Sequence, residues 1–306
     1  MMNENDSINK WSTFTKQIQK NDPFFLIHSN KFNLTKNSKV FTIGSCFARN
    51  IEEVLENDFQ FPITEYLGNK FEYQARRTRG ILNKFTPGSI FHELDWLSSI
   101  LNNGNFEEIT KDYFCFELND ELCIDLGLQN FVPVTFNRFY ERRKEILNIY
   151  SQIKDSESII ITFGLIEEWR YKDKPIQHAF NRKEMIKKGK NELSFSILTN
   201  DDTEKIINQI VNKIFSINKK IKIILTVSPV PLDTTFSNKH IIVANSLSKS
   251  TLRSSLNLII NKKNIDYFPS YEMINCYGPN AFEPDLRHVK NEVVNNIFLL
   301  FKKIYL

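Results

Sequence analysis

Ser45 stands where a strand is expected to meet a helix, in a position that suits a nucleophile. Gly44 before it lets the backbone turn sharply. The free N–H groups of a first helical turn can hold the negative charge that develops on a carbonyl oxygen under attack. A serine at this position is also the usual N-cap of a helix, so position alone leaves both roles open. A capping box is absent, because the third residue after Ser45 is Ala48.

A nucleophilic serine needs a base, and the stretch Asp-Leu-Arg-His at 285–288 offers one. The spacing of three residues predicts that Asp285 folds back onto the His288 imidazole, where it would fix the tautomer and stabilise the imidazolium. The same pattern also fits a surface histidine beside a charged loop. The other histidines are His28, His92, His178 and His240.

The elements expected around these residues alternate between strands and helices. Short apolar runs predict strands at 39–43, 59–66 (weakened by Pro62 or placed at an edge), 158–163, 221–227 and 265–268. Apolar periodicity predicts helices from Phe47 onward and at 89–101, 135–153, 203–215, about 243–261 and about 289–305, and alternation with an Asn119-Asp120 turn predicts a hairpin over 112–126.

This alternation predicts an α/β fold whose parallel sheet is covered by helices on both faces. Ligands of such sheets bind outside the carboxyl ends of the strands. Ser45 and His288 lie far apart in the chain, but both follow or flank elements at that edge. The fold itself could therefore bring the hydroxyl and the imidazole together.

Composition narrows the class of protein. The chain has 306 residues, 41% hydrophobic and 25% charged, which is incompatible with intrinsic disorder. A net charge of +4 is far below the concentrated basic face of a nucleic-acid binder, so no nucleic-acid partner is expected. No apolar run reaches the length of a membrane span, and the N-terminal 20 residues lack the apolar core of a secretory signal. We expect a cytoplasmic protein.

The cysteines and histidines give no metal site. Cys46, Cys115, Cys123 and Cys276 lack ligand spacing and are too few for a disulfide scaffold, so we expect reduced thiols and no metal. Residues 1–27 are interpreted as a polar N-terminal extension and residues 28–306 as a single domain, with a hairpin insertion at about 111–134.

The five residues at 44–48 read Gly-Ser-Cys-Phe-Ala, and the chain resembles the GSCFA-domain family of the SGNH (GDSL-like) hydrolase superfamily. The resemblance runs from about His28 to the end of the chain. It continues in family order through the segments 80–87, 162–169, 226–232, 267–272 and 285–289. It implies a three-layer α/β/α sandwich with a flavodoxin-like sheet, with Ser45 as nucleophile, His288 as base and Asp285 as its orienter.

The same resemblance implies an oxyanion hole. In the superfamily it uses the N–H of the serine, a glycine N–H and an asparagine side chain. Here the stretch 164–167 reads Gly-Leu-Ile-Glu, so the usual asparagine is absent. The assignment becomes Ser45, with Gly80 and Gly164 as backbone donors and Asn83 as the substitute side chain.

Further residues are candidates for substrate binding. Arg76 and Arg79, with Arg77 between them, could grip a phosphate or an anionic glycan, although a solvated loop explains them as well. Glu168 and Trp169 follow the strand at 158–163 and could line a pocket or simply pack. Cys46 could attack in place of Ser45, since a thiol at a helix start has a lowered pKa, or could pack as a small apolar residue.

The expected reaction is acyl transfer at an ester or thioester. The resemblance implies an O-acyl(acetyl)transferase or esterase that acts on a glycan or polysaccharide precursor as its small-molecule or glycan substrate. We expect no permanently bound cofactor, and acetyl-CoA or another acyl donor could be the co-substrate. Water or a sugar hydroxyl would accept the acyl group. The alternative is a non-catalytic module that uses the same cleft to bind a carbohydrate or other ligand. The sequence leaves the oligomeric state open.

Overall fold

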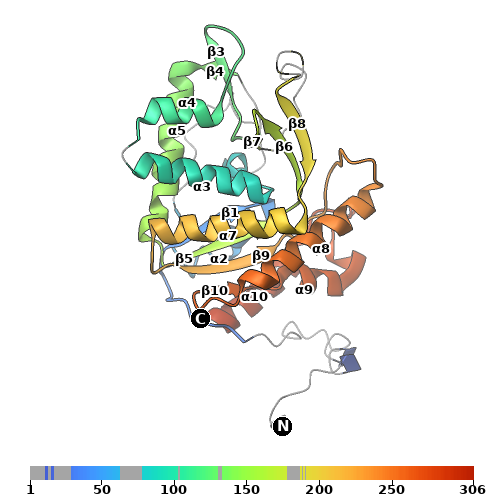
Figure 1. Ribbon diagram of the computed structural model, residues 1–306. Helices are drawn as coiled ribbons and strands as arrows, with labels where there is room; N and C mark the ends of the chain where they lie inside the picture. The colour runs from blue at the N-terminus through green and yellow to red at the C-terminus, as the bar shows by residue number, and fades with distance from the viewer. Residues whose placement is uncertain are drawn as a thin grey trace.

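The fold is built on a four-stranded parallel sheet, here seen in a computed structural model that describes residues 11–12, 15–16, 29–62, 78–102, 104–129, 133–177, 187, 189 and 191–306. The sheet order is β1-β5-β9-β10 (Figure 1). The strands are β1 (Val40–Gly44), β5 (Ser158–Phe163), β9 (Lys222–Val227) and β10 (Ile265–Tyr267). Each lies within about one residue of the predicted run, and the parallel α/β class is confirmed.

Helices cover both faces of this sheet, because successive strand residues point to opposite sides and are apolar on each. Phe41 and Ile43 of β1 belong to one core cluster, which the helices of the first face complete. Val40 belongs to the opposite cluster. The first face carries α3 (Pro87–Leu101), α5 (Phe136–Tyr150), α7 (Asn200–Ile217) and α8 (Ile241–Ile259), and the second α2 (Cys46–Leu55), α9 (Ser270–Tyr277) and α10 (Asn291–Tyr305).

On the first face α3 and α7 lie side by side (Figure 1). Both begin at a threonine whose side chain accepts from the third helical N–H in a capping box, Thr86 for α3 and Thr199 for α7. The predicted helices at 89–101 and 203–215 are therefore confirmed, and the caps extend each of them by two or three residues. No helix in the described ranges is both long and apolar enough to cross a membrane.

On the second face the last helix closes the core. The rings of Phe47 in α2 and Phe298 in α10 lie 5.8 Å apart. The C-terminal end of α10 is tied to distant parts of the chain, since Leu34 N–H donates to the Tyr305 carbonyl at 2.7 Å and the Tyr305 hydroxyl donates to Asp266 at 3.0 Å. The two ends of the described domain are thus joined by hydrogen bonds.

The strand predicted at 59–66 is present only in its first residues. Gln60 bridges Lys39 in parallel fashion, and its carbonyl accepts the Val40 N–H at 2.9 Å. This places the segment beside β1, at the free edge of the sheet, as the proline at position 62 favours. The remainder, from residue 63, lies outside the described residues.

Two small antiparallel sheets surround the main one. The first joins β2 (Cys115–Glu117), β3 (Leu122–Asp125) and β4 (Val134–Thr135). The hairpin predicted over 112–126 is wrong at its start, because residues 112–114 belong to α4 (Phe106–Phe114). Asn105 caps that helix by accepting the N–H groups of Glu107 and Glu108, and the helix continues until the strand begins. The second sheet joins β6 (Glu167–Tyr171), β7 (Lys174–Ile176) and β8 (Leu193–Ile197).

A buried network of charges braces the segment that lies beside Gly44. The Lys84 ammonium contacts Glu93 of α3 at 2.9 Å, and Arg143 of α5 contacts Glu93 at 2.8 Å and Asp125 of β3 at 2.8 Å. All four side chains are buried, and their opposite charges compensate for the loss of water. The Lys84 backbone N–H donates to the Gly44 carbonyl at 2.7 Å, so the network holds the turn after β1 in place.

Candidate active site

The turn from β1 into α2 packs directly on the neighbouring strand. Gly44 has a φ of +139°, and a Cβ built on it would lie 2.8 Å from the backbone nitrogen and carbonyl carbon of Thr162 in β5. Only glycine fits this approach without strain. Ser45 follows at 2% exposure, and its Oγ accepts the Phe47 N–H at 3.3 Å. Ser45 is therefore an N-cap, which is one of the two roles expected for it.

Ser45 also lines a cavity of about 550 Å³, its open mouth included. The walls come from the loops after β1, β5 and β9 and from the loop before α10, so the carboxyl edge of the sheet forms the cavity. Its surface is mostly apolar, with a few polar groups. The lining residues are Ser45, Cys46, Phe85, Gln129, Gly164, Leu165, Ser228, Val230, Pro231, Leu232, Asp233, Thr234 and Arg287.

The predicted contact between Asp285 and His288 is present. His288 Nδ1 and Asp285 Oδ2 lie 2.5 Å apart, and Asp285 Oδ1 accepts the N–H groups of Arg287 at 2.9 Å and His288 at 3.0 Å. An antiparallel bridge between Phe282 and Val289 closes this loop. The carboxylate therefore fixes the imidazole, with Nε2 left as the nitrogen that could take a proton.

The structure does not join His288 to Ser45. No hydrogen bond between the two is present in the described part of the chain, and the His288 side chain is 55% exposed. Arg287, its neighbour, is the residue of this loop that lines the Ser45 cavity. Catalytic hydrogen bonds are often long or absent before substrate binds, so the pairing of Ser45 with His288 stays a prediction.

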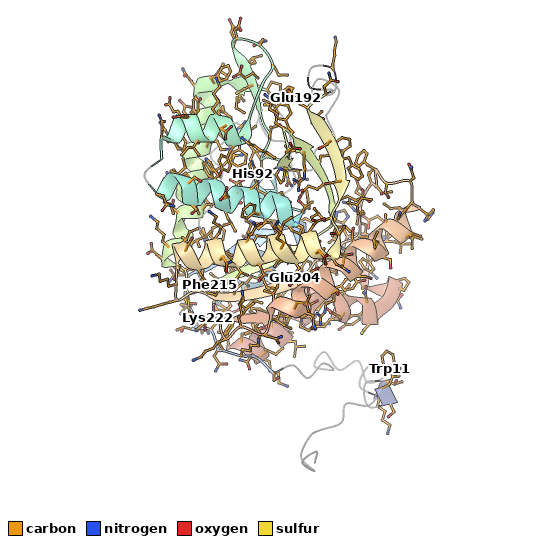
Figure 2. The ribbon with its side chains drawn as sticks, in the orientation of Figure 1. Trp11, His92, Glu192, Glu204, Phe215 and Lys222 are labelled. Atoms are coloured by element: carbon orange, nitrogen blue, oxygen red, sulfur yellow. The ribbon has the colours of Figure 1, made fainter. Side chains whose placement is uncertain are left out.

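The other described histidines occupy structural positions. His92 lies in α3 (Figure 2), where its Nε2 contacts the Tyr113 carbonyl at 2.9 Å and its ring stacks on Tyr113. Burial lowers the pKa of His92 to about 4, so this imidazole is neutral at physiological pH. His240 caps α8. His28 and His178 lie outside the described residues.

The donors predicted for the oxyanion hole have other partners in this structure. The N–H of Ser45 donates to the Thr162 carbonyl at 3.0 Å, and the N–H of Gly164 donates to the Phe85 carbonyl at 2.9 Å. Asn83 Nδ2 donates to Gln129 Oε1 at 3.2 Å. Gly80 lies in the 3₁₀ helix Thr78–Leu82 and is not among the residues that line the cavity. An oxyanion would have to displace these bonds, and the assignment stays a prediction.

Two of the residues predicted to bind substrate, Glu168 and Trp169, are not among the residues that line the cavity. Glu168 is buried behind the start of α3, where it accepts from the Thr86 hydroxyl at 3.0 Å and pairs with Arg170 at 2.7 Å. Burial raises the pKa of this carboxyl. Trp169 packs on Phe195 and Phe236, with ring centres 5.3 Å from each. Arg79 is part of the 3₁₀ helix, while Arg76 and Arg77 lie outside the described residues.

Several residues at or behind the cavity were not predicted from the sequence. Arg287 and Asp233 form an ion pair at 3.0 Å across two of the lining loops. Gln129 extends to the cavity from the segment after β3. Lys249 lies behind the cavity wall. The sequence could have indicated that this lysine is buried, because Lys249, Leu252 and Leu256 follow one another at helical spacing on the buried face of α8. No cluster of metal-ligating side chains is present within the described ranges.

The Asp285 carboxyl should titrate well below its ordinary pKa of about 3.9. The hydrogen bond from His288 and the two backbone N–H groups stabilise its charged form and lower its pKa. A depressed folded-state pKa stabilises the loop at pH values above the ordinary one, and this stabilisation is lost as the pH falls through the folded value. Carboxyl-carbon NMR titration measures this midpoint, and His288→Ala should raise it. An ordinary midpoint in the unaltered protein would contradict the geometry.

Comparison with known proteins finds a matching family and similar solved structures. The family model described as "GSCFA family" matches residues 39–301. Among solved structures, the crystal structure of a carbohydrate esterase family 3 from Talaromyces cellulolyticus is similar at 9% identity, with 51% of this chain and 61% of that chain covered and a TM-score of 0.29. The match thus spans less than two thirds of that esterase, and so weak a likeness carries no argument here. None of the curated proteins compared matches the chain.

Proposed function

Because this chain belongs to the GSCFA family, we propose that it transfers acyl groups through a covalent intermediate on Ser45. The observation that carries the proposal is the serine at the glycine turn, which lines the same cavity as the loop that holds the Asp285–His288 pair. The proposal includes an SGNH-type sandwich formed by residues 28–306. The parallel sheet with helices on both faces supports that part of it.

In the first step Ser45 Oγ bonds to the acyl carbon of an ester or thioester. His288 Nε2 takes the hydroxyl proton, and Asp285 stabilises the imidazolium. The bond to the alcohol or thiol leaving group then breaks, and His288 returns the proton to that group. The positive end of α2 and the amides near Ser45 stabilise the oxyanion, in exchange for their present partners. This step needs a hydrogen bond between His288 Nε2 and Ser45 Oγ, which the described part of the chain does not show before substrate binds.

In the second step an acceptor hydroxyl attacks the acyl-serine, with His288 now taking the acceptor proton. The bond between Ser45 Oγ and the acyl carbon then breaks, and His288 returns the proton to Ser45 Oγ. Water as acceptor makes the protein an esterase, and a sugar hydroxyl makes it an O-acyltransferase. We propose a glycan or glycan precursor as the acceptor, with acetyl-CoA or another acyl donor as co-substrate; this choice rests on the family resemblance. The mostly apolar cavity wall is suited to an acyl chain.

The acyl-enzyme provides the direct test. Incubation of the protein with p-nitrophenyl acetate should raise its intact mass by one acetyl group, and peptide mapping should locate that group on Ser45. Addition of sugar acceptors should shorten the lifetime of the adduct if the protein is a transferase. Acyl transfer by this serine would be refuted by an adduct on another residue. It would also be refuted if neither p-nitrophenyl acetate nor acetyl-CoA gave an adduct.

One observation favours the alternative of a non-catalytic binding module. Ser45 Oγ and the N–H groups of Ser45 and Gly164, two of those predicted for the oxyanion hole, are engaged in hydrogen bonds around the turn. A module of this kind would bind carbohydrate in the cavity and never form an adduct. Saturable sugar binding without acylation of Ser45 would establish that function in place of the enzymatic one.

A further inference from the structure

Lys249 is a fully enclosed lysine in the middle of α8, with 1% of its surface exposed. Its Nζ donates to two backbone carbonyls, that of Gly164 at 2.7 Å and that of Val230 at 2.8 Å. Gly164 follows β5 and Val230 follows β9, so a single side chain joins the loops that leave two neighbouring strands of the sheet.

No carboxylate compensates this charge within the described part of the chain. The contrast is Lys84, which is equally buried but contacts Glu93 at 2.9 Å. A buried ammonium without an acid partner is unfavourable for folding, and an apolar side chain of similar length would pack at less cost. The hydrogen bonds from Lys249 Nζ to the two carbonyls are therefore the interactions that offset the cost of burying its charge.

Both carbonyls belong to walls of the Ser45 cavity, because Gly164 and Val230 line it together with the serine. Gly164 lies beside Ser45, since a Cβ built on this glycine would lie 3.4 Å from Ser45 Cβ. Its N–H is held by Phe85, and its carbonyl is held by Lys249. The lysine thus fixes the peptide group that flanks Ser45 and the facing loop at the same time.

We propose that Lys249 is a positioning residue for Ser45, which clamps the loops after β5 and β9 so that the cavity walls keep their spacing around the serine. The inference rests on the proposed function for its effect on acyl transfer. The spacing of the cavity walls does not depend on the proposed function. The reactivity of the Cys46 thiol, which lines the same cavity, measures that spacing independently.

The clamp should respond to pH near neutrality. Burial lowers the pKa of Lys249 to about 7. Cys46 of α2 is the titratable group that acts on the ammonium, and it acts to raise that pKa; the other groups that face it are the neutral carbonyls of the two loops. An ammonium donates stronger hydrogen bonds than a neutral amine, so the clamp is tightest at acidic pH.

The test compares Lys249→Met with a matched control, Lys222→Met. Lys222 also donates to a backbone carbonyl, that of Asn33 at 2.8 Å, but it lies at the start of β9, at the end of that strand opposite the cavity (Figure 2). Three quantities are measured from about pH 5 to about pH 9: the rate at which a fluorophosphonate labels Ser45, the rate at which iodoacetamide alkylates Cys46, and the thermal midpoint.

In Lys249→Met, labelling of Ser45 should fall at least about tenfold at acidic pH, because the peptide beside the serine is released. The pH of half-maximal alkylation of Cys46 should rise, since the neighbouring ammonium no longer favours the thiolate. The thermal midpoint should stay level or rise, because a buried charge is removed. Lys222→Met should leave both rates unchanged.

Unchanged rates of Ser45 labelling and Cys46 alkylation in Lys249→Met would overturn the inference. A decrease in both rates that merely follows a decrease in the thermal midpoint would also overturn it, because it would reflect lost stability. Absence of labelling in the unaltered protein would refute the proposed function, while alkylation of Cys46 would still decide the role of Lys249. If Lys249→Met does not fold, Lys249→Gln replaces it, since glutamine keeps N–H donors without the charge. In this variant too the pH of half-maximal Cys46 alkylation should rise, and an unchanged value would overturn the inference.

Discussion

Ser45→Ala should abolish acyl transfer, with a loss of about 10⁴-fold or more in turnover of p-nitrophenyl acetate. The variant lacks the oxygen that would carry the acyl group, and no other residue of the turn supplies a hydroxyl. It also lacks the side chain that accepts the Phe47 N–H, so we expect a loss of about 1 kcal/mol in the free energy of unfolding. Intact-mass analysis and denaturant unfolding measure the two effects separately.

Thr199→Ala is the matched control for this variant. Thr199 caps α7 as Ser45 caps α2, but it is exposed and does not line the cavity. Its replacement should cost a similar amount of stability and leave turnover intact. His288→Ala provides a second arm, with turnover lost to a comparable degree and no effect on the cap. Activity retained in Ser45→Ala, or retained in His288→Ala, would refute the corresponding assignment.

Gly44→Ala should have the largest effect on folding. The residue has a positive φ, and an added Cβ would lie 2.8 Å from the backbone nitrogen and carbonyl carbon of Thr162, within a central strand that cannot move aside. Backbone strain and overpacking together amount to roughly 2 to 6 kcal/mol. Because a native domain is stable by only about 5 to 15 kcal/mol, we expect a marked loss of soluble protein. Thermal unfolding of the remaining fraction gives the magnitude.

Gly278→Ala separates strain from steric overlap. Gly278 also has a positive φ, at +60°, but no heavy atom lies within 4 Å of a Cβ built on it. Its replacement should cost about 1 kcal/mol, from backbone strain alone. Equal destabilisation by the two substitutions would mean that the contact with Thr162 does not limit the residue at position 44.

The central sheet was predictable because its strands are buried on both faces. The segments that form β1, β5 and β9 are mostly apolar, and the helices that cover the sheet show a clear apolar stripe, so pattern and position agree. The resemblance to the GSCFA family, which rested on short segments, is confirmed over residues 39–301.

The antiparallel strands of the sheet β7-β6-β8 could not be predicted in the same way. β6, β7 and β8 are short, partly exposed and rich in polar residues, and α9 has only eight residues. Their stability comes from partners distant in sequence, such as the Trp169 ring on Phe236, which local periodicity does not report. The same reason explains why the hairpin prediction includes residues 112–114, which form the last turn of α4.

For the candidate site, the sequence predicted the contacts that arise within one turn of chain. Ser45 at its turn and Asp285 beside His288 are of this kind. The cavity wall depends on loops from separate strands, so Arg287, Asp233 and the bonds of Lys249 required the fold. The assignments of Ser45, His288 and Asp285 as catalytic residues stay predictions.

The packing of α10 on α2 has a consequence for biosynthesis. Phe47 meets its partner Phe298 only after α10 has left the ribosome, so the part of the apolar stripe of α2 that packs on α10 stays uncovered until then. Polypeptides that stop before α10 would expose this stripe permanently and become targets for chaperones and proteases. Messages truncated before the codons of α10 should therefore yield degraded protein rather than a shortened, stable product.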